Sequence, residues 1–298
     1  MKRIAIAAAL ATVLGASAFA PVQAQESLTL KKIKDTGTIT LGHRESSIPF
    51  SYYDDKQQVI GYSHELMLKA VEGIKNELKL AKLDAKLMPV TSANRITLVQ
   101  NGTIDIECGS TTNNLERQKQ VGFSNTIFVI GTRLMAKKDA GVKDFADLAG
   151  KNVVTTAGTT SERLLRKLNE EKQLGMSIIS AKDHGESFLT LETGRAVAFM
   201  MDDALLYGEL AKAKRPADWT VTGTPQSYEA YGCMMSKDDP AFKALVDRVV
   251  SGMMKSGEME KLYSKWFMSP IPPKGININY PLNAETKEAF ANPSSKGI

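Results

Sequence analysis

The stretch that decides the fold is Ile106-Glu107-Cys108-Gly109-Ser110-Thr111-Thr112-Asn113-Asn114-Leu115-Glu116-Arg117. Its pattern predicts the end of a buried strand, a hydroxyl-rich turn and the first turn of a helix. Thr112 or Asn113 is expected to cap that helix, since Asn113-x-x-Glu116 has the spacing of a capping box. A helix start attracts anions through its unpaired backbone N–H groups, and Arg117 adds a planar guanidinium suited to a carboxylate. An ordinary strand–helix junction would contain the same residues, so the rest of the chain decides between the two interpretations.

This stretch closes one series of helices and strands, and a second series follows it. Apolar spacing predicts strands at 38–42, 84–89, 104–107, 151–155, 177–180 and 196–200. It predicts helices at 28–36, 62–80, 91–100, 143–150, from 159, at 184–192 and at 204–213. Residues 32–45 and 144–162 both run through helix, glycine, strand and polar loop, and residues 92–112 and 185–203 repeat the plan. We therefore predict an α/β protein with two lobes, each a mostly parallel sheet flanked by helices.

Two extended apolar segments, 123–133 and 226–235, follow the two series and are predicted to cross between the lobes. Residues 239–267 have helical spacing, and a Pro-rich, then polar, tail begins at Ser269. The predicted division of the chain is a signal peptide at 1–24, the first part of lobe 1 at 25–126, lobe 2 at 127–227, and the return to lobe 1 with the tail at 228–298.

Polar loops follow the predicted strands in both lobes. They are Arg44–Ser47, Ser110–Thr112, Gly158–Ser161 and Asp202. Ligands of open α/β sheets bind beyond the carboxyl ends of the strands. These loops are therefore expected to face one site, with Asp203 as the alternative to its neighbour Asp202.

The N-terminus has the pattern of a secretory signal peptide. Lys2-Arg3 is a basic start, Ile4–Leu14 is apolar, and the small residues of Val22-Gln23-Ala24 favour cleavage after Ala24 over the earlier site Ala18-Phe19-Ala20. No stretch approaches the ~20 apolar residues of a membrane-spanning helix. We expect a mature protein in the periplasm. The formal net charge of +5 includes Lys2 and Arg3, so the mature chain is near +3, without the basic block of a nucleic-acid-binding protein.

The chain contains two cysteines, Cys108 and Cys233. In an oxidising compartment they are predicted to form a disulfide. Two buried free thiols are the alternative, because the sequence does not give the distance between them. The three histidines, His43, His64 and His184, lack the spacing of metal ligands, so we expect neither a metal nor a cofactor. His64 opens a helix and is expected to be exposed.

The chain resembles the extracytoplasmic solute-binding proteins of ABC transporters, specifically the polar amino-acid group. The resemblance covers essentially the whole mature chain and is carried by five strings in order. They are His43-Arg44-Glu45-Ser46-Ser47, Glu107–Asn114, Gly158-Thr159-Thr160-Ser161-Glu162, Lys182-Asp183-His184-Gly185 and Phe199-Met200-Met201-Asp202-Asp203. It implies the two-lobed periplasmic-binding-protein fold, with two crossover strands and a ligand, L-glutamate or L-aspartate, enclosed between the lobes.

The resemblance also implies roles for individual residues. Arg117, the N–H groups near Thr112 and the helix start at Thr160 would hold the ligand's α-carboxylate. Asp202 and the Ser110 region would hold its α-ammonium. Arg44, Ser92 and Arg95 would hold the side-chain carboxylate, with His184 closing from the other lobe. The three arginines and Asp202 sum to +2, which suits a dicarboxylate of net charge −1.

Three classes of function fit such a chain. The first is a binding protein, expected to be a monomer, that closes around its ligand and docks on a membrane permease. The second is an exported lyase or dehydratase on the same fold, with Glu45, Glu107, Asp202 and His184 available for acid–base work. The third, a sensor domain, would need a membrane helix or signalling module that the sequence does not contain.

Overall fold

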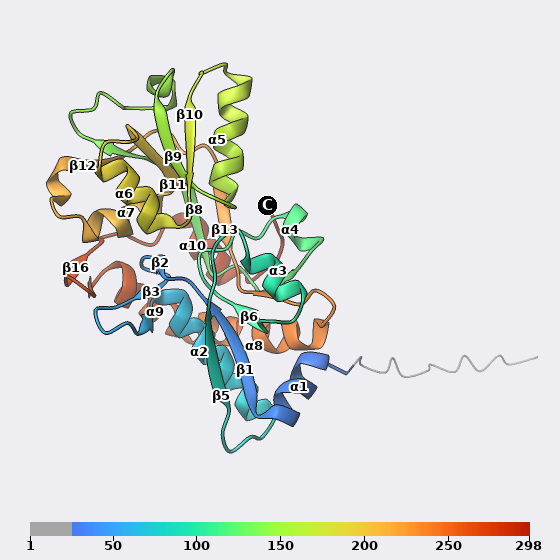
Figure 1. The fold of residues 1–298 in the computed structure, drawn as a ribbon. Coiled ribbons are helices and arrows are strands. Elements are labelled where there is room, and N and C mark those ends of the chain that lie inside the picture. Colours follow the sequence, from blue (N-terminus) through green and yellow to red (C-terminus); the bar gives the residue numbers. More distant parts are fainter. Residues whose placement is uncertain (1–25) are drawn as a thin grey trace, which may run out of the picture.

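The computed structural model describes residues 26–298, so the predicted signal peptide at 1–24 lies outside the described residues. Figure 1 shows two sheets, one above the other, with helices around each of them. Within residues 26–298, no helix has the length and apolar content needed to cross a membrane. The prediction of a two-lobed α/β protein is confirmed.

A five-stranded sheet forms the centre of the first lobe, in the order β5-β1-β6-β14-β7. The strands are β1 (Thr38–His43), β5 (Asp84–Pro89), β6 (Ile106–Glu107), β7 (Gly122–Phe123) and β14 (Met234–Met235). β5, β1 and β6 are parallel, whereas β14 runs antiparallel to both β6 and β7. The helices of this lobe are α1 (Leu28–Thr36), α2 (Tyr62–Glu77), α3 (Arg95–Gln100), α4 (Leu115–Gln118), α8 (Pro240–Ser256) and α9 (Glu258–Phe267). A small antiparallel sheet joins β2 (Ser46–Ser47), β3 (Ser51–Tyr53) and β4 (Val59–Ile60).

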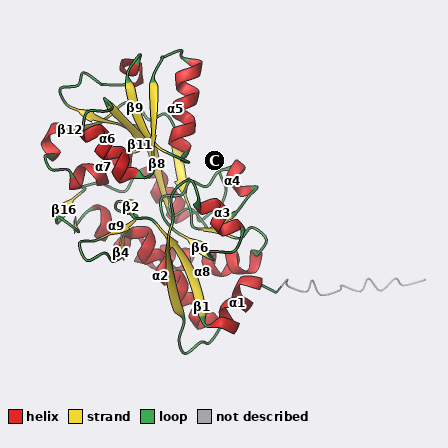
Figure 2. Ribbon diagram, in the orientation of Figure 1, coloured by secondary structure: helices red, strands yellow, loops and turns green. Residues whose placement is uncertain are grey.

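The sheet of the second lobe has the order β10-β9-β11-β8-β12, with β13 paired to β8. Its strands are β8 (Phe128–Lys137), β9 (Asn152–Thr156), β10 (Ser177–Ala181), β11 (Ala198–Asp202), β12 (Trp219–Thr222) and β13 (Tyr228–Tyr231). The helices α5 (Thr160–Glu171), α6 (His184–Glu192) and α7 (Asp203–Lys212) flank it, with two 3-10 turns, η1 (Phe145–Leu148) and η2 (Pro216–Asp218) (Figure 2). β10, β9 and β11 repeat the parallel arrangement of β5, β1 and β6, so the predicted repeat is present. The parallel part of each sheet is confined to these three strands.

The two crossing segments pair with each other. The first half of β8 pairs with β13, and its second half pairs with β11 and β12. Phe128 of β8 and Tyr231 of β13 are both fully buried, and each packs against Phe50, with ring centroids 4.9 and 5.2 Å from it. The core of the first lobe therefore anchors both crossing strands.

The tail forms a hairpin of β15 (Pro270–Ile271) and β16 (Ile276–Asn277) and then α10 (Ala284–Ala291). It ends beside the deciding stretch, where the carbonyl of Ile298 accepts from the backbone N–H of Leu115 at 3.3 Å. Figure 1 shows this end of the chain next to α4.

Three local predictions were wrong. Helix α4 is capped by Asn114, whose side chain accepts from the N–H of Arg117, and not by Thr112 or Asn113, because Asn113 uses its own N–H to pair with the carbonyl of Ala230. The helical region 239–267 breaks at Gly257, which has a φ of 75° that favours glycine. His64 is buried, at 5% exposure, because α2 packs its first turn inward.

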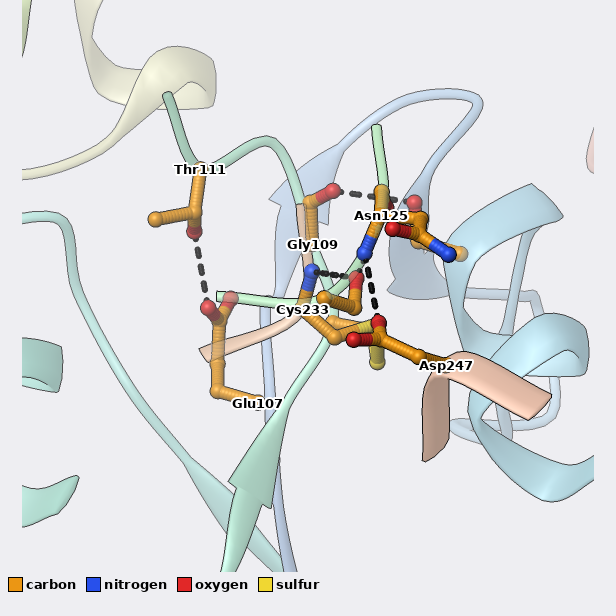
Figure 3. Close-up of a disulfide and its surroundings, with 9 residues drawn as sticks. Glu107, Gly109, Thr111, Asn125, Cys233 and Asp247 are labelled. Atoms are coloured by element: carbon orange, nitrogen blue, oxygen red, sulfur yellow. Dashed lines mark hydrogen bonds between the residues drawn. A yellow bond between two sulfur atoms is a disulfide. The ribbon is translucent and has the colours of Figure 1, made fainter. Parts of the chain in front are cut away.

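A disulfide joins Cys108 and Cys233, whose Cα atoms are 4.3 Å apart. Both residues are fully buried. Cys108 follows β6 and Cys233 precedes β14, and these strands are neighbours in the first sheet. Figure 3 shows the bond beside Glu107 and Gly109. The predicted disulfide is confirmed, and it ties two segments of the same lobe together.

Candidate functional site

The structure brings the predicted site residues together at the carboxyl ends of the parallel strands. Each follows or ends one strand of a parallel trio. In the first lobe Arg44 follows β1, Ser92 and Arg95 follow β5, and Ser110, Thr112 and Arg117 follow β6. In the second lobe Thr160 follows β9, His184 follows β10, and Asp202 ends β11. Thr160 is half-buried, and the other eight side chains are buried at 1–6% exposure.

Capping residues fix the helix starts at this site. The Thr159 hydroxyl accepts from the N–H of Glu162 at 3.0 Å and starts α5, as predicted. The Glu162 carboxylate accepts from the N–H of Gly158 at 2.8 Å, one residue earlier than a full capping box requires. Asp183 caps α6 in the same way through the N–H of Glu186. The first turns of α5 and α6 therefore both begin at the site.

The two lobes touch across the site. Gly158 has a φ of +76°, and a Cβ there would lie 2.6 Å from the Cα of Ala93 in the first lobe. The N–H of Gly185 in α6 donates to the hydroxyl of Ser46 in β2 at 3.3 Å. The structure is therefore in a closed arrangement, and the loop at Gly158 has room for a glycine only.

Three buried guanidinium groups form the positive part of the site. Nη1 of Arg95 donates to the carbonyl of Ser110 at 3.1 Å and to the hydroxyl of Thr111 at 2.5 Å. Arg117 donates from Nη1 to the carbonyl of Thr112 at 2.9 Å and from Nη2 to the carbonyl of Gly158 at 3.4 Å. All these acceptors are neutral, so none of the three guanidinium groups bonds to an anionic side chain of residues 26–298.

Several donors at the site have no hydrogen-bond partner among residues 26–298. They are Nη1 and Nη2 of Arg44, Nε of Arg95, Nε of Arg117, the hydroxyl of Ser92 and Nε2 of His184. A buried polar atom without a partner costs about 1–3 kcal/mol, and more when it is charged. All of these atoms belong to residues that the sequence assigned to ligand binding. Together they form a cradle that an anion would satisfy.

The pKa values show that burial and the close approach of positive groups disfavour the charged forms at this place. Burial, followed by the charge of Arg95, lowers the pKa of Arg44 from 12.5 to about 10. Burial, followed by the charges of Arg95 and Arg163, lowers the pKa of Arg117 to about 9. Burial, followed by Arg44 and Arg95, holds the pKa of His184 well below its usual 6.5. His184 is therefore neutral, and its Nδ1 lies 2.9 Å from the hydroxyl of Thr156.

Asp202 forms the negative part of the site. Its Oδ1 accepts from the hydroxyl of Ser161 at 2.9 Å, and its Oδ2 accepts from the hydroxyl of Tyr231. Burial, followed by the charge of Glu229, raises the pKa of Asp202 to about 7. A cation beside Asp202 would favour its ionised form. The alternative, Asp203, instead accepts from the hydroxyl of Tyr280 at 2.9 Å and from the N–H of Ala204 at 2.8 Å.

Two buried carboxylates were missing from the predicted set. The sequence makes Glu107 a candidate for acid–base work only, and it assigns no role to Glu229. Glu107 accepts from the hydroxyl of Thr111 at 2.7 Å, which connects it through Thr111 to Arg95 (Figure 3). Counted with Asp202, these carboxylates balance the three arginines, so the predicted charge sum of +2 was wrong. Glu107 reaches the site from the end of β6, within the deciding stretch, and Glu229 reaches it from the crossing strand β13. No motif in the sequence marks the position of Glu229.

The described part of the chain contains no cluster of three or more His, Cys, Asp or Glu side chains placed to hold a metal ion. The arrangement can bind a ligand through groups of opposite charge, because guanidinium groups and a carboxylate lie at different places in the site. The cationic donors of Arg44, Arg95 and Arg117 come from the first lobe, and the carboxylate of Asp202 comes from the second lobe. That pattern suits a small molecule carrying both carboxylate and ammonium groups.

Comparison with known proteins agrees with this geometry. The profile of the bacterial extracellular solute-binding proteins, family 3, matches residues 39–269. An L-glutamate/L-aspartate-binding protein of Pseudomonas aeruginosa strain PAO1 is 62% identical over 296 residues, covering 99% of this chain and 98% of the relative. A glutamate/aspartate import solute-binding protein of Escherichia coli K12 is 60% identical and covers 91% of this chain and 89% of the relative.

Among solved structures, a mutant of the arginine-binding protein of T. maritima matches with a TM-score of 0.72 and 25% identity, covering 80% of this chain and 99% of that one. The matches support a binding protein and give no support to the lyase alternative. The chain belongs to the bacterial extracellular solute-binding proteins, family 3.

Proposed function

We propose that this protein is the extracytoplasmic substrate-binding subunit of an ABC transporter, that it binds L-glutamate or L-aspartate between its lobes, and that it delivers the amino acid to a membrane permease. The observation that carries this proposal is that buried Arg44, Arg95 and Arg117 have guanidinium donors without a partner in the part of the chain that the structure describes. An unpaired buried charge is costly, and a ligand carboxylate would remove that cost.

The proposed contacts follow the polarity of the site. Arg117 and the backbone N–H groups of Thr112 and Thr160 would hold the α-carboxylate. The first N–H groups of α5 have no partner inside the helix and carry a partial positive charge, which favours an anion there. Asp202 and the Ser110 region would hold the α-ammonium, which would restore the ionised form of Asp202.

The distal carboxylate would lie against Arg44, Ser92 and Arg95, with His184 completing the site from the second lobe. Both Nη atoms of Arg44 and the hydroxyl of Ser92 lack partners among the described residues. Because neutral His184 has one proton, the bond of its Nδ1 to Thr156 decides whether Nε2 donates. The preference for an acidic side chain is a matter of local charge at Arg44, since the buried carboxylates balance the arginines over the site as a whole.

The relatives support an acidic ligand. Those at 60–62% identity are named for glutamate and aspartate, whereas two relatives named for glutamine are 29% and 31% identical.

The proposed first lobe consists of residues 25–126 and 228–298, and the proposed second lobe consists of residues 127–227. Support for these boundaries comes from the two crossing strands, since β8 begins at Phe128 and β13 at Tyr228. We expect a monomer.

Calorimetric titration tests the proposal. Protein that has been unfolded, freed of any bound amino acid and refolded should be titrated with each of the twenty amino acids. Glutamate and aspartate should bind tightly, and lysine and leucine should not bind. A response to neutral amino acids equal to that for glutamate would contradict the proposed site, and turnover of the amino acid would revive the lyase alternative.

A further inference from the structure

Glu229 is buried at 4% exposure, and the proposed ligand contacts do not include it. It lies in β13, opposite Ile130 of β8, where the two crossing strands pair. Figure 1 shows β13 between the two sheets. A carboxylate at this place is next to both lobes. Burying it costs free energy unless hydrogen bonds satisfy it, so its partners indicate what it does.

One oxygen of Glu229 binds a hydroxyl from each lobe. Its Oε2 accepts from the hydroxyl of Thr112 and, at 2.5 Å, from the hydroxyl of Thr160. The two hydroxyl oxygens lie 3.3 Å apart. Thr112 belongs to the turn after β6 of the first sheet, and Thr160 opens α5, which packs on β9 and β11 of the second sheet.

These two bonds differ in what holds each partner. Thr112 forms an isolated bridge with Tyr231 of β13, two residues from Glu229, so the turn and the crossing strand are fixed to one another. Ser227 also donates to the other oxygen, Oε1, at 3.3 Å. Among residues 26–298, the hydroxyl of Thr160 bonds to β13 only through this carboxylate. Separation of the lobes would therefore break the bond to Thr160 and leave the bond to Thr112 intact.

We propose that Glu229 is a positioning residue that clasps the second lobe onto the first through Thr160, and that it retains the ligand by slowing the opening of the closed form. This inference rests on the proposed function. The acceptor is held ready by Thr112 and Ser227 before the lobes close, so little ordering is left to be lost on closure. A hydrogen bond to a carboxylate is roughly twice as strong as one between neutral groups.

The clasp makes a kinetic prediction. A contact that forms after closure acts on dissociation and leaves the encounter of ligand and open protein unchanged. Glu229→Ala should raise the dissociation rate of glutamate by roughly 10- to 100-fold and change the association rate by less than about threefold. Glu229→Gln keeps one neutral acceptor oxygen and should give a smaller increase. The Gln variant also covers the case in which the Ala variant does not fold.

Stopped-flow fluorescence would measure these rates, with Ser227→Ala as the matched control. Ser227 contacts the other oxygen of the same carboxylate, and its hydroxyl lies 2.7 Å from that of Thr132 in the neighbouring crossing strand β8. Among the described residues it has no bond to Thr160, so its loss should leave the dissociation rate near that of the wild type. Thr160→Val removes the hydroxyl and keeps the backbone N–H. Because Thr160→Val and Glu229→Ala break the same bond, the double variant should release glutamate no faster than the Glu229→Ala variant does.

An unchanged dissociation rate in Glu229→Ala, or full additivity of the Glu229 and Thr160 changes, would overturn the clasp. Failure of the wild type to bind either acidic amino acid would instead overturn the proposed function. Single-molecule energy transfer between dyes at Lys34→Cys and Lys167→Cys, one on each lobe, would then test the clasp without ligand. The closed fraction should fall in Glu229→Ala, and an equal closed fraction in both proteins would refute the clasp.

Discussion

Replacing Arg44 with methionine tests the distal end of the proposed site. Arg44 is 1% exposed, and neither of its Nη atoms has a partner among residues 26–298. Arg95, the other arginine assigned to that end, already donates to Ser110 and Thr111. We therefore expect Arg44 to be the stronger discriminator between glutamate and glutamine, which have nearly the same shape and differ in charge.

The pKa of Arg44 gives the size of the effect. Its fall from 12.5 to about 10 corresponds to about 3 kcal/mol, the free energy of holding that charge in the closed site without an anion. A glutamate carboxylate offsets this cost, and the neutral amide of glutamine does not. Arg44→Met should therefore weaken glutamate binding by about 10²-fold and glutamine binding by less than about tenfold.

Titration calorimetry of both ligands into both proteins measures this difference directly. Arg195→Met is a matched control, because Arg195 is exposed and outside the site, and it should bind both ligands as the wild type does. Arg117→Met should weaken glutamate and glutamine alike, since both carry the α-carboxylate. Equal losses for the two ligands in Arg44→Met, with a glutamate-selective loss in Arg117→Met, would show that the two ends of the ligand are reversed.

Three further predictions follow from the charges, the closure and the disulfide. Burial and Glu229 raise the pKa of Asp202 to about 7, and a bound ammonium would lower it, so binding should release a proton. Affinity should then fall by up to about tenfold per pH unit as the pH drops from 7 towards 5. A binding enthalpy that does not vary with the ionisation enthalpy of the buffer would contradict this. Glutamate or aspartate at ~100 times Kd should stabilise the protein by about 2.7 kcal/mol, raising the Tm, whereas lysine and leucine should not. The Cys108–Cys233 bond spans 125 residues, so its loss in Cys233→Ser should lower the free energy of unfolding by about 4–5 kcal/mol in the chain-entropy model, as measured by denaturation. Thiol labelling of the unreduced, denatured wild type should find no free thiol.

The parts of the fold that the sequence predicted well are those that depend on local patterns. The helix at 28–36 begins after Ser27 and ends at Gly37, as its capping residues require, and the helix at 184–192 has the predicted bounds. The deciding stretch was harder, because the sequence offered Thr112 and Asn113 as caps of α4 and the cap is their neighbour Asn114. Pairing of Asn113 with Ala230, far away in the sequence, selects Asn114. Tertiary contacts of this kind are invisible to a local pattern.

The site shows the same division. Residues at strand ends and helix starts, such as Arg44 and Asp202, could be found because loop position follows from the predicted strands. Glu229 could not be found in this way. Its partners, Thr112 and Thr160, are more than sixty residues away and belong to different lobes, and the strand pattern around Glu229 resembles that of any half-buried strand.

The position of β14 determines the order in which the lobes can be completed during synthesis. Residues 128–231 contain every strand of the second sheet, whereas the first sheet has β14, at 234–235, between β6 and β7. A nascent chain that ends before residue 233 can therefore assemble the second lobe, but its first lobe lacks an interior strand and the partner of Cys108. The first sheet can therefore be completed only after the last quarter of the chain has begun to be made, which gives an exported protein a long interval in an incompletely folded state.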